Sequence, residues 1–164
     1  MTDASITSAA ELEALLARAR ETRDPSVLAA AIPYASVIGL SLAQDGEGDA
    51  IVARMRYADD LIGDSTIPAL HGGTIAALLE STAILSVLWR AEAPVLPRTI
   101  TITIDYLRTG RPVDTLCRAS IVRQGRRIVV VSVRAFQEDE AAPIATAIVH
   151  VLCTTDERAA PEPR

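Results

Sequence analysis

HGGTIAALLESTAILSVLWR, residues 71–90, decides the fold of this chain. Between Gly72 and Trp89 the run carries one formal charge, that of Glu80, among apolar and small side chains. Its length fits either a membrane-spanning helix, which needs about 20 apolar residues, or the buried helix of a soluble domain. Length therefore leaves two alternatives, which the phase of the side chains has to separate.

At about 100° per residue, the run has one bulky face and one small face. The bulky face comprises Ile75, Leu78, Leu79, Thr82, Leu85, Ser86 and Trp89, and the small face comprises Gly73, Ala76, Ala77, Glu80, Ala83 and Ile84. The bulky face is typical of a side packed into a core, and the small face lets a ligand or a second subunit approach the backbone beside Glu80. A charge at mid-bilayer costs roughly 2.5 to 3.5 kcal/mol. We therefore expect a buried helix and no membrane association.

Length and charge bound the class of protein. A chain of 164 residues is long enough for one domain with a real core. Its net charge of -5 and pI near 5.0 argue against a nucleic-acid-binding protein. Between Pro97 and Ala135, however, eight arginines face only two acidic residues, Asp105 and Asp114, so that this segment has a net charge of +6. Because the arginine fork binds phosphate oxygens in pairs, the segment is a candidate anion site.

The cysteines and the amino terminus indicate a cytoplasmic protein. Cys117 and Cys153 match no metal-ligand spacing and no disulfide framework, so we expect two reduced core residues and no metal site. The first residues include early acidic side chains and lack a continuous apolar core, which argues against a signal peptide.

Two helical pieces are predicted before the first strand. Ser8 followed by Glu11 matches a capping box, and the leucines after it recur at helical spacing. A second, shorter piece begins at Asp24, which can cap it, and ends at Pro33. Residues 1–32 are therefore predicted to be an N-terminal helical extension.

Residues 33–154 are predicted to form an α+β domain. Strand-like runs over 34–43 and 50–57 flank an Asp-Gly turn and predict a hairpin, and 58–70 are predicted to be a loop. After the helix come four predicted antiparallel strands, TITITIDYL (99–107), LCRASIVR (116–123), IVVVSVRAF (128–136, buried on both faces) and IATAIVHVLC (144–153). One helix against about six strands gives a long central helix lying on a curved antiparallel sheet. Residues 155–164 are predicted to be a disordered tail.

Candidate catalytic and binding groups are predicted at the start and in the middle of the central helix. Free amides in the first turn after His71, at Gly72 and Gly73, can hold an anion or polarise a carbonyl oxygen; the alternative is that the glycines only allow a tight entry into the helix. A carboxylate at Glu80 is costly to bury unless it is paired, as with an arginine, or useful. Burial would raise the pKa of Glu80 and make it a base near neutral pH.

HGGTIAALLESTA (71–83) followed by TITIDYLRTGRPVDTLCRASIVRQGRRIVVVSVRAF (101–136) resembles the hotdog-fold acyl-CoA thioesterases of the phenylacetate-pathway (PaaI-like) type. The resemblance covers roughly residues 31–153 and implies a hotdog fold. It implies that Glu80 is the general base or the nucleophile, that the Gly72 N–H polarises the thioester carbonyl, and that Thr99 helps to orient the reacting group. Where some relatives have Asn or Gln, this chain has Ser65, so that Ser65 or Thr66 would fill that role.

The resemblance also implies the substrate and the assembly. The substrate is an acyl-CoA, with coenzyme A as part of the substrate and no separate cofactor. Residues expected to bind it are Gly73, Ser65, Arg108, Arg111, Arg126 and Arg127. Hotdog subunits pair through a continuous sheet with active sites at the interface, which predicts a homodimer or homotetramer.

Two other functions stay open at this point. A hydratase or dehydratase acting on acyl thioesters would need His71 to act with Glu80, whereas we expect His71 mainly to hold the loop before the helix. A non-catalytic acyl-CoA-binding module is the third hypothesis, favoured by the lack of the Asn that some relatives have at the position of Ser65.

Overall fold

The computed structural model describes residues 9–46, 49–64, 66–91 and 97–153. The helices are α1 (Ala9–Thr22), α2 (Ser26–Ala30), α3 (Pro33–Val37) and α4 (Gly72–Arg90), with a 3-10 turn at Asp59–Leu61. The strands are β1 (Leu40–Gln44), β2 (Ile51–Met55), β3 (Ile62–Asp64), β4 (Ala69–Leu70), β5 (Arg98–Tyr106), β6 (Thr115–Gln124), β7 (Ile128–Phe136) and β8 (Ala145–Leu152). The predicted α+β order of leading helix, hairpin, long helix and four strands is confirmed.

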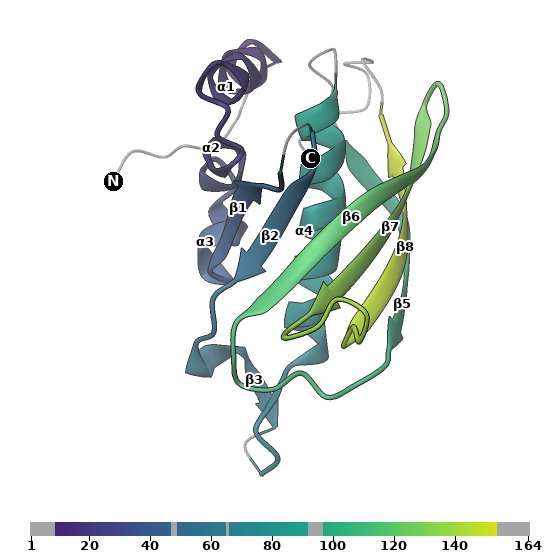
Figure 1. Cartoon of the computed structure of the whole chain (residues 1–164). Coiled ribbons are helices and arrows are strands. Elements are labelled where there is room, and N and C mark those ends of the chain that lie inside the picture. Colours follow the sequence, from purple (N-terminus) through teal and green to yellow (C-terminus); the bar gives the residue numbers. More distant parts are fainter. Residues whose placement is uncertain (1–8, 47–48, 65, 92–96, 154–164) are drawn as a thin grey trace, which may run out of the picture.

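Six of the strands form one antiparallel sheet in the order β1-β2-β6-β7-β8-β5. The sheet curves around α4, which lies on its concave side (Figure 1). Strand β5 follows α4 in the chain but pairs with β8, so it stands at the edge of the described sheet. This edge and the helix beside it carry the features on which the candidate site depends.

The predicted division of α4 into two faces agrees with its burial. Leu78, Leu79, Thr82 and Leu85 on the bulky face are fully buried against the sheet. Glu80 and most of its small neighbours are only half-buried. By length and composition α4 could cross a membrane, and 56% of its most apolar window is buried within the domain.

The N-terminal helices share the core of the domain. Leu12, Leu16 and Ala19 of α1 are buried in the same cluster as the side chains of α4 and the sheet. Helix α2 packs on α1, β1 and α4, and α2 and α3 cover the β1 edge (Figure 1). The described part of the predicted extension, residues 9–32, is therefore packed onto the sheet domain. The capping box lies outside the described residues because it depends on Ser8.

Three expectations about local structure are wrong. Pro33 does not end a helix but begins α3, because proline suits the first helical position; residues 34–37 are helical instead of strand-like. The predicted loop over 58–70 contains the small β3–β4 ribbon. Strand β7 buries one face only, since Val129, Val131 and Val133 are buried while the alternate side chains are exposed or half-buried. The predicted tail over 155–164 lies outside the described residues.

Candidate functional site at the start of α4

A tight backbone bend delivers the chain into α4. The His71 N–H donates to the Leu61 carbonyl at 2.8 Å, which ties the residue before the helix to the end of the 3-10 turn. A Cβ at Gly63 would stand 2.8 Å from both Cα and Cδ2 of His71, so only glycine allows this approach. The position of His71 is therefore set by the β3–β4 region rather than by α4 alone.

His71 caps α4 and leaves one first-turn amide open. Its Nδ1 accepts a hydrogen bond from the Gly73 N–H at 2.9 Å, and its carbonyl accepts from the N–H groups of Thr74 and Ile75 at 3.0 and 3.3 Å. In the described part of the chain, the Gly72 N–H has no hydrogen-bond partner. The two glycines therefore differ, since the Gly73 amide already has a hydrogen-bond partner and the Gly72 amide is free to bind a substrate oxygen.

The end of β5 forms a wall beside Gly72. The Tyr106 hydroxyl donates to the Gly72 carbonyl at 2.9 Å, and a Cβ at Gly72 would lie 3.5 Å from the Tyr106 ring. The Thr74 hydroxyl donates to the His71 carbonyl at 2.7 Å. Sequence reasoning missed both hydroxyls. The bond of Thr74 could have been predicted from the sequence, because a threonine at the third helical position often bonds to the backbone nearby. The contact of Tyr106 could not, because it depends on how β5 crosses the helix.

Glu80 stands apart from Gly72 along the helix. At 1.5 Å per residue, the eight positions between them correspond to about 12 Å along the axis. Glu80 is half-buried, and its side-chain carboxylate forms no ion pair or hydrogen bond with any of the described residues. The predicted alternative of a salt bridge with an arginine is therefore not formed within the described chain. Its carboxylate lies uncommitted on the small face of α4.

Thr99 lies far from the start of α4 in the same subunit. Seven residues of strand at about 3.3 Å each separate it from Tyr106 by about 23 Å. Its hydroxyl is buried without a partner among the described residues. Ser65 lies outside the described residues, and its neighbour Thr66 hydrogen-bonds to Asp64 through both its N–H and its hydroxyl, at 2.8 and 2.6 Å.

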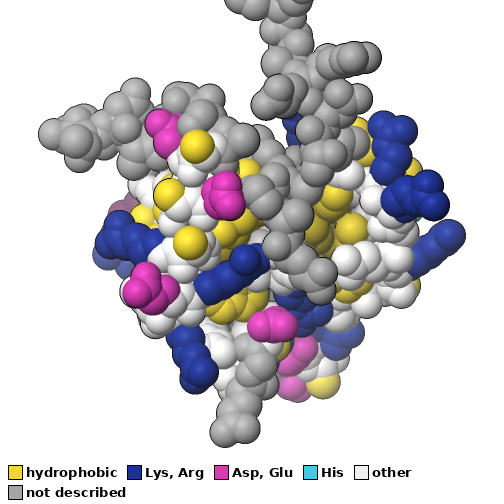
Figure 2. All heavy atoms as spheres, turned by 90° about the horizontal axis from the view of Figure 1, so that it is seen from above, with side chains coloured by type: hydrophobic (Ala, Val, Ile, Leu, Met, Phe, Trp, Pro, Cys, Tyr) yellow, Lys and Arg dark blue, Asp and Glu magenta, His cyan; other side chains and the backbone are white. Residues whose placement is uncertain are grey.

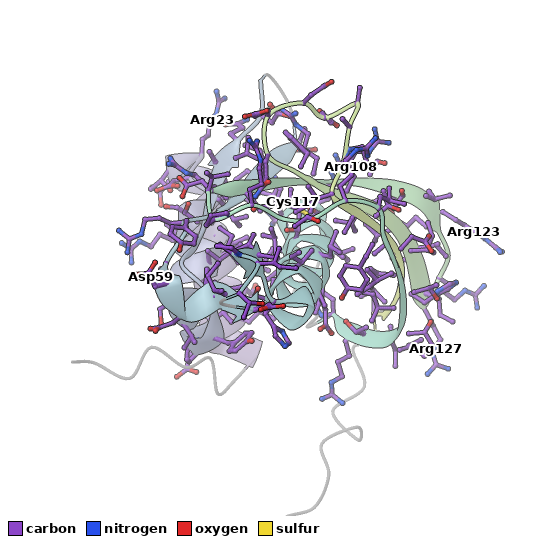
Figure 3. All side chains as sticks on the ribbon, turned by 90° about the horizontal axis from the view of Figure 1, so that it is seen from below. Arg23, Asp59, Arg108, Cys117, Arg123 and Arg127 are labelled. Atoms are coloured by element: carbon purple, nitrogen blue, oxygen red, sulfur yellow. The ribbon has the colours of Figure 1, made fainter. Side chains whose placement is uncertain are left out.

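The four candidate arginines form two separate pairs. Arg108 donates to the Pro143 carbonyl at 2.8 Å, and Arg111 pairs with Glu138 at 2.7 Å. Arg126 and Arg127 lie on the exposed β6–β7 turn, toward the C-terminal end of α4. Figure 3 shows Arg127 pointing outward and well apart from Arg108. Viewed from that end of the helix, basic side chains gather along the side where β6 and β7 lie (Figure 2).

A cavity of about 160 Å³ lies beside this second pair. It opens between the end of α4 and the β6–β7 turn, and its lining includes Val87, Arg90, Ile121, Arg126 and Val129. The lining thus combines aliphatic side chains with two arginines and Gln124. It is suited to a ligand with an apolar body and an anionic group.

The described cysteines are free thiols, and the described acidic side chains form no metal-binding cluster. Cys117 is fully buried, and burial raises the pKa of its thiol to about 12, which makes it unreactive. Cys117 and Cys153 are both free. The described residues contain no group of three or more His, Cys, Asp or Glu side chains that could hold a metal ion.

The family model of the Thioesterase superfamily matches residues 68–144, from just before α4 to just before β8. The chain belongs to the thioesterase superfamily. The matched segment contains the open Gly72 amide, Glu80 and Tyr106.

Solved structures of other proteins share the fold. A Chromobacterium violaceum protein is 32% identical, with a TM-score of 0.69 and coverage of 87% of this chain and 98% of its own. A phenylacetic acid degradation-related protein of Ralstonia eutropha is 21% identical, with a TM-score of 0.65 and coverage of 74% and 90%. A Bacillus halodurans protein solved with CoA is 19% identical, with a TM-score of 0.67 and coverage of 89% and 90%. A search of curated proteins gave no match.

Proposed function

We propose that this superfamily member hydrolyses an acyl-CoA to the free acid and coenzyme A. The observation that carries the proposal is the Gly72 N–H, which is the first-turn amide left without a partner in the described chain while its neighbours are bound to His71. An N–H at a helix N-terminus, aided by the helix dipole, stabilises negative charge on a carbonyl oxygen. Such a donor acts on the oxyanion that forms when a thioester is attacked.

Glu80 is the proposed base for water or nucleophile, and it acts at a site made by two subunits. An attacking oxygen has to stand about 3 to 3.5 Å from the carbonyl carbon, whereas Glu80 and Gly72 of one helix are about 12 Å apart along the axis. If the small faces of two α4 helices meet in antiparallel fashion, Glu80 of one subunit reaches the amide of the other. The edge position of β5, with Ile100 and Tyr106 about half exposed, supports pairing at this side.

Coenzyme A is the proposed carrier group of the substrate. Arg126 borders the cavity at the far end of α4 and stands beside Arg127, and neither side chain forms an ion pair within the described chain. In an antiparallel dimer this end of one subunit faces the Gly72 end of the other. The proposal therefore assigns the CoA phosphates to Arg126 and Arg127, and gives Arg108 and Arg111 a lesser role because both already bind protein oxygens.

The test is release of free thiol from a panel of acyl-CoAs by the parent protein and by Glu80→Gln. Removal of a general base is expected to lower kcat on the order of 100- to 10,000-fold. Glu13→Gln, which removes the same charge from an exposed position on α1, is the matched control and is expected to keep parental activity. If folded Glu80→Gln hydrolyses every substrate at the parental rate, the assigned role of Glu80 is wrong.

Mixing two inactive variants tests the shared site. Gly72→Pro removes the amide and Glu80→Gln removes the carboxylate, so each homodimer lacks one group in both sites. A hybrid dimer has one site with both groups intact if the groups come from different subunits. Subunit exchange is then expected to restore up to half of the parental activity per hybrid. Absence of recovery, with hybrids detected by native mass spectrometry, would place both groups in one subunit.

The hydratase alternative receives less support from the geometry. His71 would have to act as an acid or base, but its Nδ1 already accepts from the Gly73 N–H and holds the start of α4. Enoyl-CoA is therefore expected to be consumed without hydration product. Formation of a 3-hydroxyacyl-CoA, followed by chromatography, would reverse this assignment.

A further inference from the structure

A side-chain hydroxyl holds each of the two peptide groups that flank Gly72. The Thr74 hydroxyl donates to the His71 carbonyl at 2.7 Å, and this carbonyl belongs to the same peptide group as the Gly72 N–H. The Tyr106 hydroxyl donates to the Gly72 carbonyl at 2.9 Å, which belongs to the next peptide group. The two residues come from different elements, α4 and β5.

A hydrogen bond to a peptide carbonyl strengthens the N–H of the same peptide as a donor, because hydrogen-bond chains polarise one another. The His71 carbonyl accepts from the N–H groups of Thr74 and Ile75, as any helix start would allow, and in addition from the Thr74 hydroxyl. Its amide partner is the free Gly72 N–H. The extra bond therefore acts on the one open donor of the site.

We propose that Thr74 and Tyr106 are positioning residues that polarise and aim the Gly72 N–H for the reaction assigned above. The inference rests on the proposed thioesterase function, because it deepens the role of the same amide. Thr74 acts on the peptide group that carries the donor. Tyr106 fixes the following peptide group, and its ring lies against Gly72. Neither hydroxyl needs to touch the substrate.

Alternative explanations differ in what they predict. The Tyr106 side chain is about half exposed, so loss of its hydroxyl removes little buried structure. If both hydroxyls only stabilise the fold, their removal lowers the melting temperature and leaves kcat unchanged. If they act on the Gly72 donor, kcat falls while KM for acyl-CoA stays nearly constant, because the donor binds the transition-state oxyanion more strongly than the ground-state carbonyl.

The experiment compares Thr74→Val, Thr74→Ser and Tyr106→Phe with the parent in steady-state hydrolysis. Loss of one polarising bond is expected to lower kcat roughly twofold to tenfold, and Thr74→Ser is expected to restore it because serine keeps the hydroxyl. Two controls lose similar bonds elsewhere and should keep parental kcat. Thr22→Val removes a bond to the Arg18 carbonyl of 2.8 Å, and Tyr57→Phe removes a bond to Asp59 of 2.7 Å.

A spectroscopic readout separates polarisation from stability. In the Glu80→Gln background, bound acyl-CoA labelled with ¹³C at the thioester carbonyl should show a carbonyl stretch shifted to lower frequency in infrared difference spectra. Adding Thr74→Val is expected to reduce this shift, and adding Thr74→Ser is not. If the parent releases no thiol from any acyl-CoA, the proposed function fails and this inference falls with it. If the parent is active but Thr74→Val and Tyr106→Phe keep its kcat and its carbonyl shift, the inference alone is wrong.

Discussion

Replacement of Gly72 by proline and by alanine isolates the contribution of one N–H group. Gly72 is the first residue of α4, where proline is well tolerated because its missing N–H would not bond within the helix. The preceding His71 has φ -64° and ψ 132°, in the extended region that a residue before proline prefers. The backbone therefore already has the conformation that Gly72→Pro requires.

The two substitutions differ in one respect that matters for catalysis. Both add a Cβ, which would lie 3.5 Å from the Tyr106 ring in ordinary van der Waals contact. Gly72→Ala keeps the N–H, whereas Gly72→Pro removes it. Loss of one oxyanion donor costs about 2.7 to 4 kcal/mol of transition-state stabilisation, so kcat of Gly72→Pro should be on the order of 100- to 1000-fold below that of Gly72→Ala. The free energy of unfolding should differ by about 1 kcal/mol or less.

The assay is thiol release from the best acyl-CoA of the panel, with urea unfolding of both variants. Inhibition by free coenzyme A should be equal in the two proteins, since the proline ring lies at the carbonyl and not at the nucleotide. A Gly72→Pro protein that stays folded and keeps kcat within about tenfold of Gly72→Ala would refute the role of the amide. Inactivity of both would instead indicate that the added Cβ displaces Tyr106.

Three further predictions concern His71, Asp114 and Cys117. His71→Asn should keep most activity because Asn is a strong N-cap. His71→Ala should lose about 1 kcal/mol of stability and some activity. Near-complete loss of activity in both variants would make the imidazole itself catalytic. Asp114 accepts from the Tyr57 N–H and from Arg54, which lowers its pKa below 3.8. The stability that these bonds contribute, about 1 kcal/mol, is present above the ordinary pKa of an Asp carboxyl and is lost as the pH falls through the lowered pKa. Asp114→Asn should therefore destabilise the protein in urea at pH 7, and its difference from the parent should shrink as the pH is lowered. Cys117, with its thiol pKa raised to about 12 and no exposure, should react with a thiol reagent only on unfolding; reaction in the native protein at pH 8 would contradict its burial.

The fold could be predicted largely from periodicity. The two faces of α4 were readable because helical phase separates Leu78 and Leu85 from Glu80, and burial agrees with that division. The Asp-Gly hairpin and the strands after the helix were equally readable, because turn residues bound their apolar runs. Pro33 was misread because a proline marks the start of one helix as well as the end of another.

The site could be predicted only as far as local sequence determines it. The arrangement of His71 and the open amide at Gly72 depends on three consecutive residues, so it could be predicted from the sequence. Tyr106 was not, since its contact with Gly72 depends on the angle at which β5 crosses α4. The four arginines looked like one basic segment in the sequence, but alternation of strand direction sends Arg108 and Arg126 to opposite ends of the sheet.

The distance between Gly72 and Glu80 along α4 is the reason for proposing a site made by two subunits. One helix places its open amide at one end and Glu80, which bears the uncommitted carboxylate, about 12 Å farther along its axis, whereas reacting atoms have to stand about 3 to 3.5 Å apart. The basic turn with Arg126 lies beside the opposite end of the same helix. The antiparallel pairing of two subunits that we propose would reverse the order of these groups on the second helix and bring the Gly72 amide of one subunit toward Glu80 of the other, with the basic turn on the same side. The subunit-mixing experiment tests this arrangement, because only a site built from two subunits recovers activity in the hybrid dimer.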